Sequence, residues 1–238
     1  MDEVKETLAI LKARWVEAAV IIAIGLAPKL PGRHYPGREI LTIGAFLLYA
    51  IISAGFLRTV HLEQTKQQSI SCLIQTGKHF FLRLLGFGLI LGLAMMVFVG
   101  LLRAVVGRSN PLLFQIGFTI ITLVLAKVIL LVPAIIIVND CSLSESFDLM
   151  WKTKLLKAKP LMVVFLIQLV VLPYLPLLLT TICGTQSAMS PVFIISKLNS
   201  VVVAVLYLMV KVMAVRFVSS IGNNNEKRID PDRMGGMI

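Results

Sequence analysis

One lysine of this chain lies where a charge is costly, and it is the first candidate for chemistry. Lys127 falls within the apolar segment Leu112–Val138, which as a helix would measure about 40 Å against a hydrocarbon core of about 30 Å. Its ammonium would therefore lie deep in a bilayer, facing other helices, a carbonyl or a water-filled cavity. Pro133 leaves the carbonyl of Ile129 free by removing one helical hydrogen bond. Together these residues predict an intramembrane polar site.

Three polar side chains in the apolar segments are candidates to line the same site. They are Gln115, Gln168 and Asn199. If they surround Lys127, the chain is a small transporter or a channel-like subunit. The alternative is that helix tilt and packing satisfy Lys127 and that no solute passes it. The sequence leaves both interpretations open.

The residues that usually carry catalysis or bind metals are scattered. The histidines are His34, His61 and His79, and the cysteines are Cys72, Cys141 and Cys183. No CxxC spacing occurs, and no pair of acidic residues lies within one apolar segment. An enzyme of the membrane needs a constellation of such groups. We therefore expect a non-catalytic protein with no catalytic residues, no cofactor and no metal site.

The composition indicates an integral membrane protein. A mean hydropathy of +0.91 and 58% hydrophobic residues exceed what a soluble core of 238 residues needs. Six spans are expected, at Ala18–Pro28, Ile40–Leu57, Leu84–Leu102, Leu112–Val138, Leu161–Cys183 and about Pro191–Val218. The predicted fold class is all-α, a polytopic membrane bundle of six transmembrane helices forming one domain over residues 1–218. Residues 219–238 lack an apolar period, which predicts a disordered cytoplasmic tail.

The distribution of lysine and arginine predicts the orientation. With six spans and a cytoplasmic N-terminus, fifteen bases fall inside and six outside, as expected for short loops that stay in the cytoplasm. A signal peptide over residues 1–28 is the rival interpretation, but the acidic residues Asp2, Glu3 and Glu6 argue against it. The net charge of +11 is spread over loops, so no nucleic-acid partner is expected.

Two segments between spans have the pattern of amphipathic elbow helices on the cytoplasmic face. The first runs from Ile70 to Leu84, with apolar residues at helical spacing. The second begins with a capping box at Ser142 and Glu145. It carries four candidate contacts for anionic lipid head groups, Lys152, Lys154, Lys157 and Lys159. The other interpretation is that these bases only hold the topology.

The second elbow also carries a resemblance to a known family. The run Leu131–Asp140 and the following residues Ser142–Trp151 resemble the hallmark of the YciC-like bacterial inner-membrane family. The wider group includes membrane domains attached to some glycerophosphodiester phosphodiesterases. The segment from Gly55–Arg58 through Gln75–Arg83 is similar to their first elbow. The resemblance implies a six-span helical protein of the bacterial inner membrane with no catalytic residues. The charge distribution adds the expectation that both termini are cytoplasmic. From the elbows and the resemblance together we expect a protein that maintains the membrane or envelope through lipid and protein contacts. The expected partner is the lipid bilayer, including anionic lipids. The sequence identifies no protein partner and no oligomeric state.

Overall fold

The computed structural model is helical throughout the part of the chain it describes, residues 2–26, 38–62, 67–106, 111–171, 174 and 191–226. The longer helices are α1 (Asp2–Ala13), α2 (Trp15–Leu26), α3 (Arg38–His61), α4 (Ile70–Val106), α5 (Pro111–Val124), α6 (Ala126–Asn139), α7 (Leu143–Lys152), α8 (Lys159–Leu166) and α10 (Pro191–Glu226). A 3-10 turn, η2 (Leu155–Lys157), precedes α8, and a π-helical segment, η3 (Ile167–Val171), follows it. The all-α class is confirmed over these residues.

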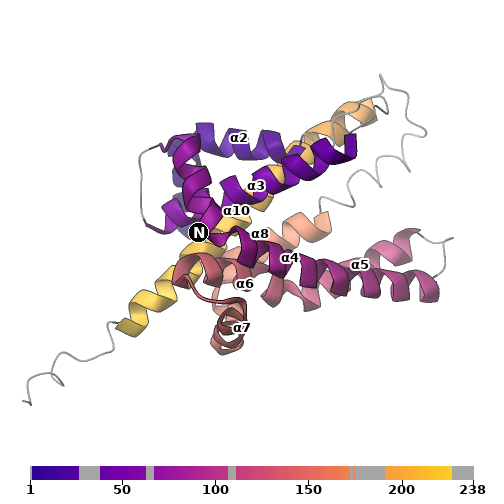
Figure 1. The fold of residues 1–238 in the computed structure, drawn as a ribbon. Helices are drawn as coiled ribbons and strands as arrows, with labels where there is room; N and C mark the ends of the chain where they lie inside the picture. The colour runs from indigo at the N-terminus through magenta and orange to yellow at the C-terminus, as the bar shows by residue number, and fades with distance from the viewer. Residues whose placement is uncertain are drawn as a thin grey trace, which may run out of the picture.

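The centre of the bundle is formed by α3, α6 and α10. Helix α10 packs against α2, α3, α6 and α8, and α3 packs most extensively against the first half of α4. Fully buried residues such as Phe56, Leu131 and Val212 come from these three central helices. Figure 1 shows α4 and α5 leading away from α3 and from the first half of α10, so these helices diverge towards one end.

Several helices are suited to a membrane. Among the described residues, three are long and apolar enough to cross one, at Thr42–His61, Ile70–Val106 and Asn199–Ile221. A fourth span results if the bent pair α5 and α6 is taken as one. The expected first and fifth spans coincide with shorter apolar helices, Trp15–Leu26 and Lys159–Leu169. Most of the remainder of the fifth lies outside the described residues, and the count of six spans stays a prediction.

The described part of the expected first span is α2, and the polar residues before it are held by buried charges. The 12 residues of α2 measure about 18 Å, and the residues after Leu26 lie outside the described part, so this span stays a prediction. Arg14 and Glu17 form a buried ion pair where α1 meets α2. The Arg14 guanidinium lies 4.6 Å from the centre of the Phe56 ring, and Glu17 also accepts a hydrogen bond from the backbone N–H of Gln68. The polar lead-in to this span is therefore part of the folded core.

The expected fourth span is two helices rather than one. Helices α5 and α6 meet at Leu125 with a bend of 45°. Pro133, expected to disturb this span, lies inside α6. A proline perturbs only the hydrogen bond to the carbonyl four residues earlier, and the bend lies outside that turn. The helix over Leu112–Val138 is therefore bent, and a single span formed by the bent pair stays a prediction.

The first elbow is not a separate helix. Its residues form the first turns of α4, which continues without a break for 37 residues, or about 55 Å. This segment packs on α3 at two glycines. A Cβ atom at Gly55 would lie 2.0 Å from the carbonyl oxygen of Leu73, and one at Gly77 would lie 1.8 Å from that of Ile51. The amphipathic pattern of this segment therefore reflects contact between two helices.

The C-terminal boundary also differs from the prediction. Helix α10 continues through Glu226, past the expected start of a disordered tail at residue 219. Neighbouring helices hold this extension. Arg216 donates to the Glu6 carboxylate of α1 at 2.5 Å, and His61 Nδ1 lies 3.2 Å from the Ser219 hydroxyl. Residues 227–238 lie outside the described part.

Candidate functional site

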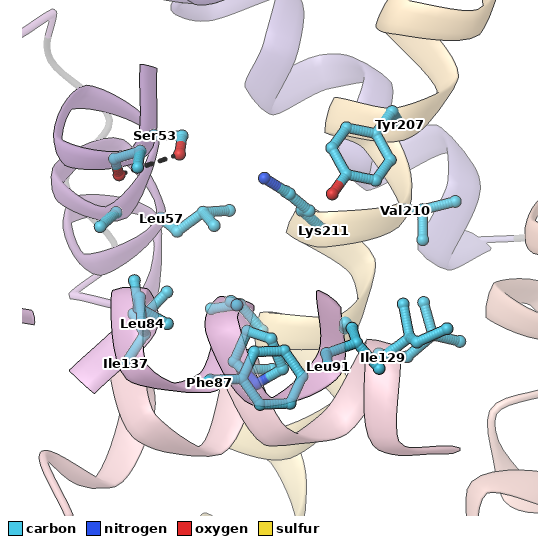
Figure 2. A pocket seen from close by; sticks show the side chains of 18 of the residues that line it. Ser53, Leu57, Leu84, Phe87, Leu91, Ile129, Ile137, Tyr207, Val210 and Lys211 are labelled. Carbon is cyan, nitrogen blue, oxygen red and sulfur yellow. Dashed lines mark hydrogen bonds between the residues drawn. The ribbon is translucent and has the colours of Figure 1, made fainter. Parts of the chain in front are cut away.

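A cavity of about 250 Å³ lies among α3, α4, α6, α8, η3 and α10 (Figure 2). Most of its wall is aliphatic or aromatic, with residues such as Phe87, Leu91 and Ile129. The polar side chains that line it are Tyr49, Ser53, Gln168, Tyr207 and Lys211. A cavity with apolar walls and a few convergent polar groups is the usual form of a ligand site.

Lys211 is the charged group of this cavity. It lies near the middle of the apolar stretch Asn199–Ile221 of α10, about 15 Å from the nearer end of that stretch. Its Nζ donates to the Tyr49 hydroxyl at 3.3 Å and lies 4.9 and 4.5 Å from the ring centres of Tyr49 and Tyr207. Such rings attract a cation through their negative faces. Figure 2 shows the lysine extending from α10 towards Ser53 and Leu57 of α3.

The Lys211 ammonium has no acidic residue beside it in the cavity. Among the described lining residues Lys211 is the one base, and none is an aspartate or glutamate. Its hydrogen-bond partner Tyr49 is a phenol, which is neutral near pH 7 because phenols ionise at about pH 10. Ser53 donates its hydroxyl to the carbonyl of Ala50 at 3.1 Å. The cavity therefore carries one positive charge inside an apolar wall.

Gln168 is a second polar side chain in the lining of the cavity. It lies on η3, and π-helical turns are frequent at functional sites. Its Oε1 is buried and has no hydrogen-bond partner in the described part of the chain. The same residue lines a second cavity of about 320 Å³ between α2, α3 and α10, which shares Phe46, Tyr49 and Tyr207 with the first. Two phenols and one amide are therefore common to the lining of both cavities.

The four residues of the predicted intramembrane site do not come together around Lys127. Lys127 donates to the backbone carbonyl of Trp151 at 3.2 Å, and its Nζ lies 5.3 Å from the centre of the Trp151 ring. This contact fits the interpretation in which helix packing satisfies Lys127. Gln115 is half-buried on α5, and Asn199 is buried on α10. Of the four, Gln168 alone lines the cavity.

Sequence reasoning missed Lys211 as a site residue. With the last span ending at Val218, Lys211 would lie only two turns from water, where a lysine extends to the surface at little cost. In the structure the apolar stretch continues to Ile221, which places Lys211 about three turns from its end. One signal was present in the sequence, because Tyr207 and Lys211 are four residues apart and so share a helix face. The contact with Tyr49, 162 positions away, depends on the tertiary fold.

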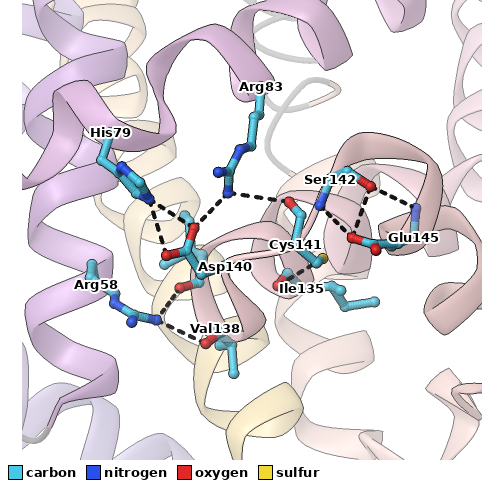
Figure 3. A network of polar contacts seen from close by, with 10 residues as sticks. Arg58, His79, Arg83, Ile135, Val138, Asp140, Cys141, Ser142 and Glu145 are labelled. Atoms are coloured by element: carbon cyan, nitrogen blue, oxygen red, sulfur yellow. Dashed lines mark hydrogen bonds and ion pairs between the residues drawn. The ribbon is translucent and has the colours of Figure 1, made fainter.

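A second polar cluster fixes the end of α6 (Figure 3). Asp140 ends this helix with φ at 50°, a left-handed backbone conformation that aspartate tolerates better than most residues. Its carboxylate accepts hydrogen bonds from His79 Nε2 at 2.9 Å and Arg83 Nη1 at 2.6 Å, both on α4. Burial raises the pKa of Asp140, but the hydrogen bonds from Arg83 and His79 outweigh it, so the net pKa is lowered.

Arg58 of α3 completes this cluster. It donates to the carbonyls of Ile137 and Val138 at 2.6 and 2.8 Å, and so satisfies two of the free acceptors at the end of α6. Its guanidinium also lies 5.6 Å from the centre of the Phe80 ring. Asp140 is paired with Arg83 and His79, and Arg58 is held by backbone carbonyls, which favours a role in joining α3, α4 and α6.

The second elbow helix, α7, begins as predicted. The Glu145 N–H donates to the Ser142 hydroxyl at 3.4 Å, and the Ser142 N–H donates to the Glu145 carboxylate at 2.8 Å. Hydrogen bonds from Ser142 lower the pKa of Glu145. The capping box is therefore confirmed. The placement of this helix on a cytoplasmic membrane surface remains a prediction.

The candidate head-group contacts lie on the surface. Lys152, Lys154, Lys157 and Lys159 are all exposed, as is Trp151. Leu155 and Ala158 are buried beneath them and attach the segment to the bundle. This arrangement leaves the four bases accessible to an anionic surface.

No known protein family, curated protein or solved structure matches this chain. The interpretation of the Lys211 cavity therefore depends on its own geometry. An ammonium and two phenols can hold an anionic oxygen, and the apolar walls can hold hydrocarbon.

Proposed function

We propose that this chain is a non-catalytic multi-pass membrane protein that binds an anionic amphiphile between its helices and serves the maintenance of the membrane or envelope. The observation that supports this proposal is the Lys211 ammonium in an apolar cavity with neutral partners. Lys211 is half-buried, and a charge that is partly removed from water is stabilised when an opposite charge joins it. An anionic ligand would supply that charge, and its hydrocarbon would fill the remaining space.

An amphiphile fits this cavity better than a small hydrated ion. A hydrated anion that enters a protein exchanges its water for several donors, whereas the cavity offers one ammonium, two phenols and one amide. A hydrocarbon chain needs only the apolar contact that residues such as Phe87 and Leu91 provide. The proposed ligand class is therefore a lipid or another acidic amphiphile.

The proposed location is the bacterial inner membrane, with six spans and both termini in the cytoplasm. The charge distribution and the resemblance to the YciC-like family support this topology. In this orientation Lys152, Lys154, Lys157 and Lys159 contact anionic head groups of the cytoplasmic leaflet, each contributing about 1 kcal/mol near such a surface.

A small transporter or channel-like subunit is the second candidate function. The observation that favours it is the depth of Lys211, because transporter substrate sites lie near the middle of the bilayer. Its site would be the Lys211 cavity rather than Lys127, whose ammonium already contacts the Trp151 carbonyl. Uptake of a radiolabelled carboxylate such as benzoate into proteoliposomes, abolished in Lys211→Met, would favour this function over the first.

Thermal unfolding of the full-length protein in a non-ionic detergent tests the proposal. Phosphatidylglycerol is added as the anionic lipid, with phosphatidylcholine as the zwitterionic control. Wild-type protein should be stabilised more by phosphatidylglycerol, and Lys211→Met should lose this difference. Lys127→Met is the matched control, since it removes a lysine charge outside the cavity, and it should keep the difference. Equal shifts in all three proteins would refute the proposal.

A further inference from the structure

We infer that the ligand of the Lys211 cavity is a monoanion, a carboxylate or phosphodiester amphiphile, and that the cavity discriminates against the dianion of a phosphomonoester. This inference rests on the proposed function and narrows its ligand class. It concerns the charge of the head group and leaves the hydrocarbon part open.

The charges that line the two cavities support this inference. The described lining of the first cavity contains one base, Lys211, that of the second contains none, and neither contains an acidic residue. The titratable groups that face Lys211 are Tyr49 of α3 and Tyr207 of α10, and the lining residues of α4, α6, α8 and η3 bring none. One negative charge therefore makes the filled site neutral. A second negative charge would remain without a basic partner against a mostly apolar wall, which is costly.

The unpaired amide oxygen points to the same conclusion. The buried Oε1 of Gln168 has no donor in the described part of the chain. As an acceptor it favours a head group that brings a proton, such as a glycerol hydroxyl or the P–OH of a singly ionised phosphate. A fully ionised phosphate has no proton to donate, and it would place one more acceptor against this oxygen.

The experiment compares lipids whose charge is known. Phosphatidylglycerol is a phosphodiester with one charge across neutral pH. Phosphatidic acid is a phosphomonoester whose second ionisation, near pH 6, makes it a monoanion at about pH 5 and a dianion at about pH 8. Apparent affinity is obtained from the thermal shift of full-length wild-type protein in detergent. The shift of Lys211→Met with the same lipid at the same pH is subtracted, which removes effects of the buffer and of other protein groups.

Five results are expected, three for the lipids and two for the variants. Phosphatidylglycerol should bind equally at both pH values, phosphatidic acid should match it at about pH 5, and phosphatidic acid should bind about tenfold more weakly at about pH 8. Lys211→Arg, which keeps the charge, should restore a shift that Lys211→Met loses. Gln168→Leu should bind phosphatidylglycerol more weakly than wild type does, because the acceptor for the head-group proton is lost. Phosphatidic acid that binds at least as tightly at about pH 8 as at about pH 5 would overturn the inference.

The monoanion could be a fatty acid or a phosphodiester lipid. Adding palmitate in the same assay at about pH 8, where its carboxylate is ionised, distinguishes the two. A Lys211-dependent shift with palmitate alone identifies a fatty acid, and one with phosphatidylglycerol alone identifies a phosphodiester lipid. Either supports a monoanion. A Lys211-dependent shift that is insensitive to charge state refutes this inference and leaves the proposed function standing. The absence of any Lys211-dependent shift refutes both.

Discussion

Replacement of Gly77 by alanine should separate α3 from α4. An alanine Cβ would lie 1.8 Å from the carbonyl oxygen of Ile51, whereas real Cβ atoms stay at least 3.0 Å from other atoms. The two helices must therefore move apart by at least about 1.2 Å, and the contacts of Leu73 and Phe80, both fully buried, are loosened. Overpacking of this kind costs about 1–3 kcal/mol.

Gly88→Ala is the matched control on the same helix, because nothing lies within 4 Å of a Cβ atom there. It should be neutral or stabilising by up to about 1 kcal/mol, through helix propensity. For a chain of this size 1 kcal/mol corresponds to about 2–4 °C. The melting temperature of Gly77→Ala in detergent, followed by circular dichroism, should therefore fall by about 2–12 °C. Equal melting of the two variants would refute the close approach of α3 and α4. It would then favour the interpretation in which Ile70–Leu84 is a separate amphipathic helix on the membrane surface.

Three further predictions concern the polar cluster, the elbow and the cavity. Because the pKa of Asp140 is lowered in the folded state, its contribution is present above pH 3.8, the ordinary value, and is lost as pH falls through the folded pKa. Asp140→Asn should therefore reduce stability at neutral pH, by less than about 1 kcal/mol for so exposed a pair; melting curves that differ from wild type only below pH 3.8 would contradict this. Ser142→Ala should destabilise α7 by about 1 kcal/mol and increase limited proteolysis within it, whereas unchanged cleavage would mean that other contacts set the helix start. Gly88→Leu should fill the cavity and weaken phosphatidylglycerol binding, whereas Gly92→Leu, an equally open position on α4 that does not line the cavity, should not; equal weakening would place the ligand elsewhere.

Local patterns predicted the local structure well. The capping box at Ser142 and Glu145 involves residues three apart, so its hydrogen bonds could be inferred from spacing alone. The helices themselves follow from long apolar segments and from the capping and breaking residues between them.

Contacts between distant residues decided what the sequence could not predict. Periodicity alone could not separate a helix lying on a membrane from one packed on α3, since both bury one apolar face, and the carbonyls facing Gly55 and Gly77 belong to another helix. The same limit applies to Lys127 and Lys211. Both are lysines in apolar segments, and only the fold places one against the Trp151 carbonyl and the other in a cavity beside Tyr49.

Native mass spectrometry of the purified protein tests the central claim most directly, because it detects the lipid that Lys211 is proposed to hold. Wild-type protein and Lys127→Met, released gently from a non-ionic detergent, should each retain a bound acidic amphiphile. Lys211→Met should have lost it, and Lys211→Arg should retain it. Equal retention in Lys211→Met and wild-type protein, or no bound acidic amphiphile in wild-type protein even after phosphatidylglycerol is added, would contradict the account.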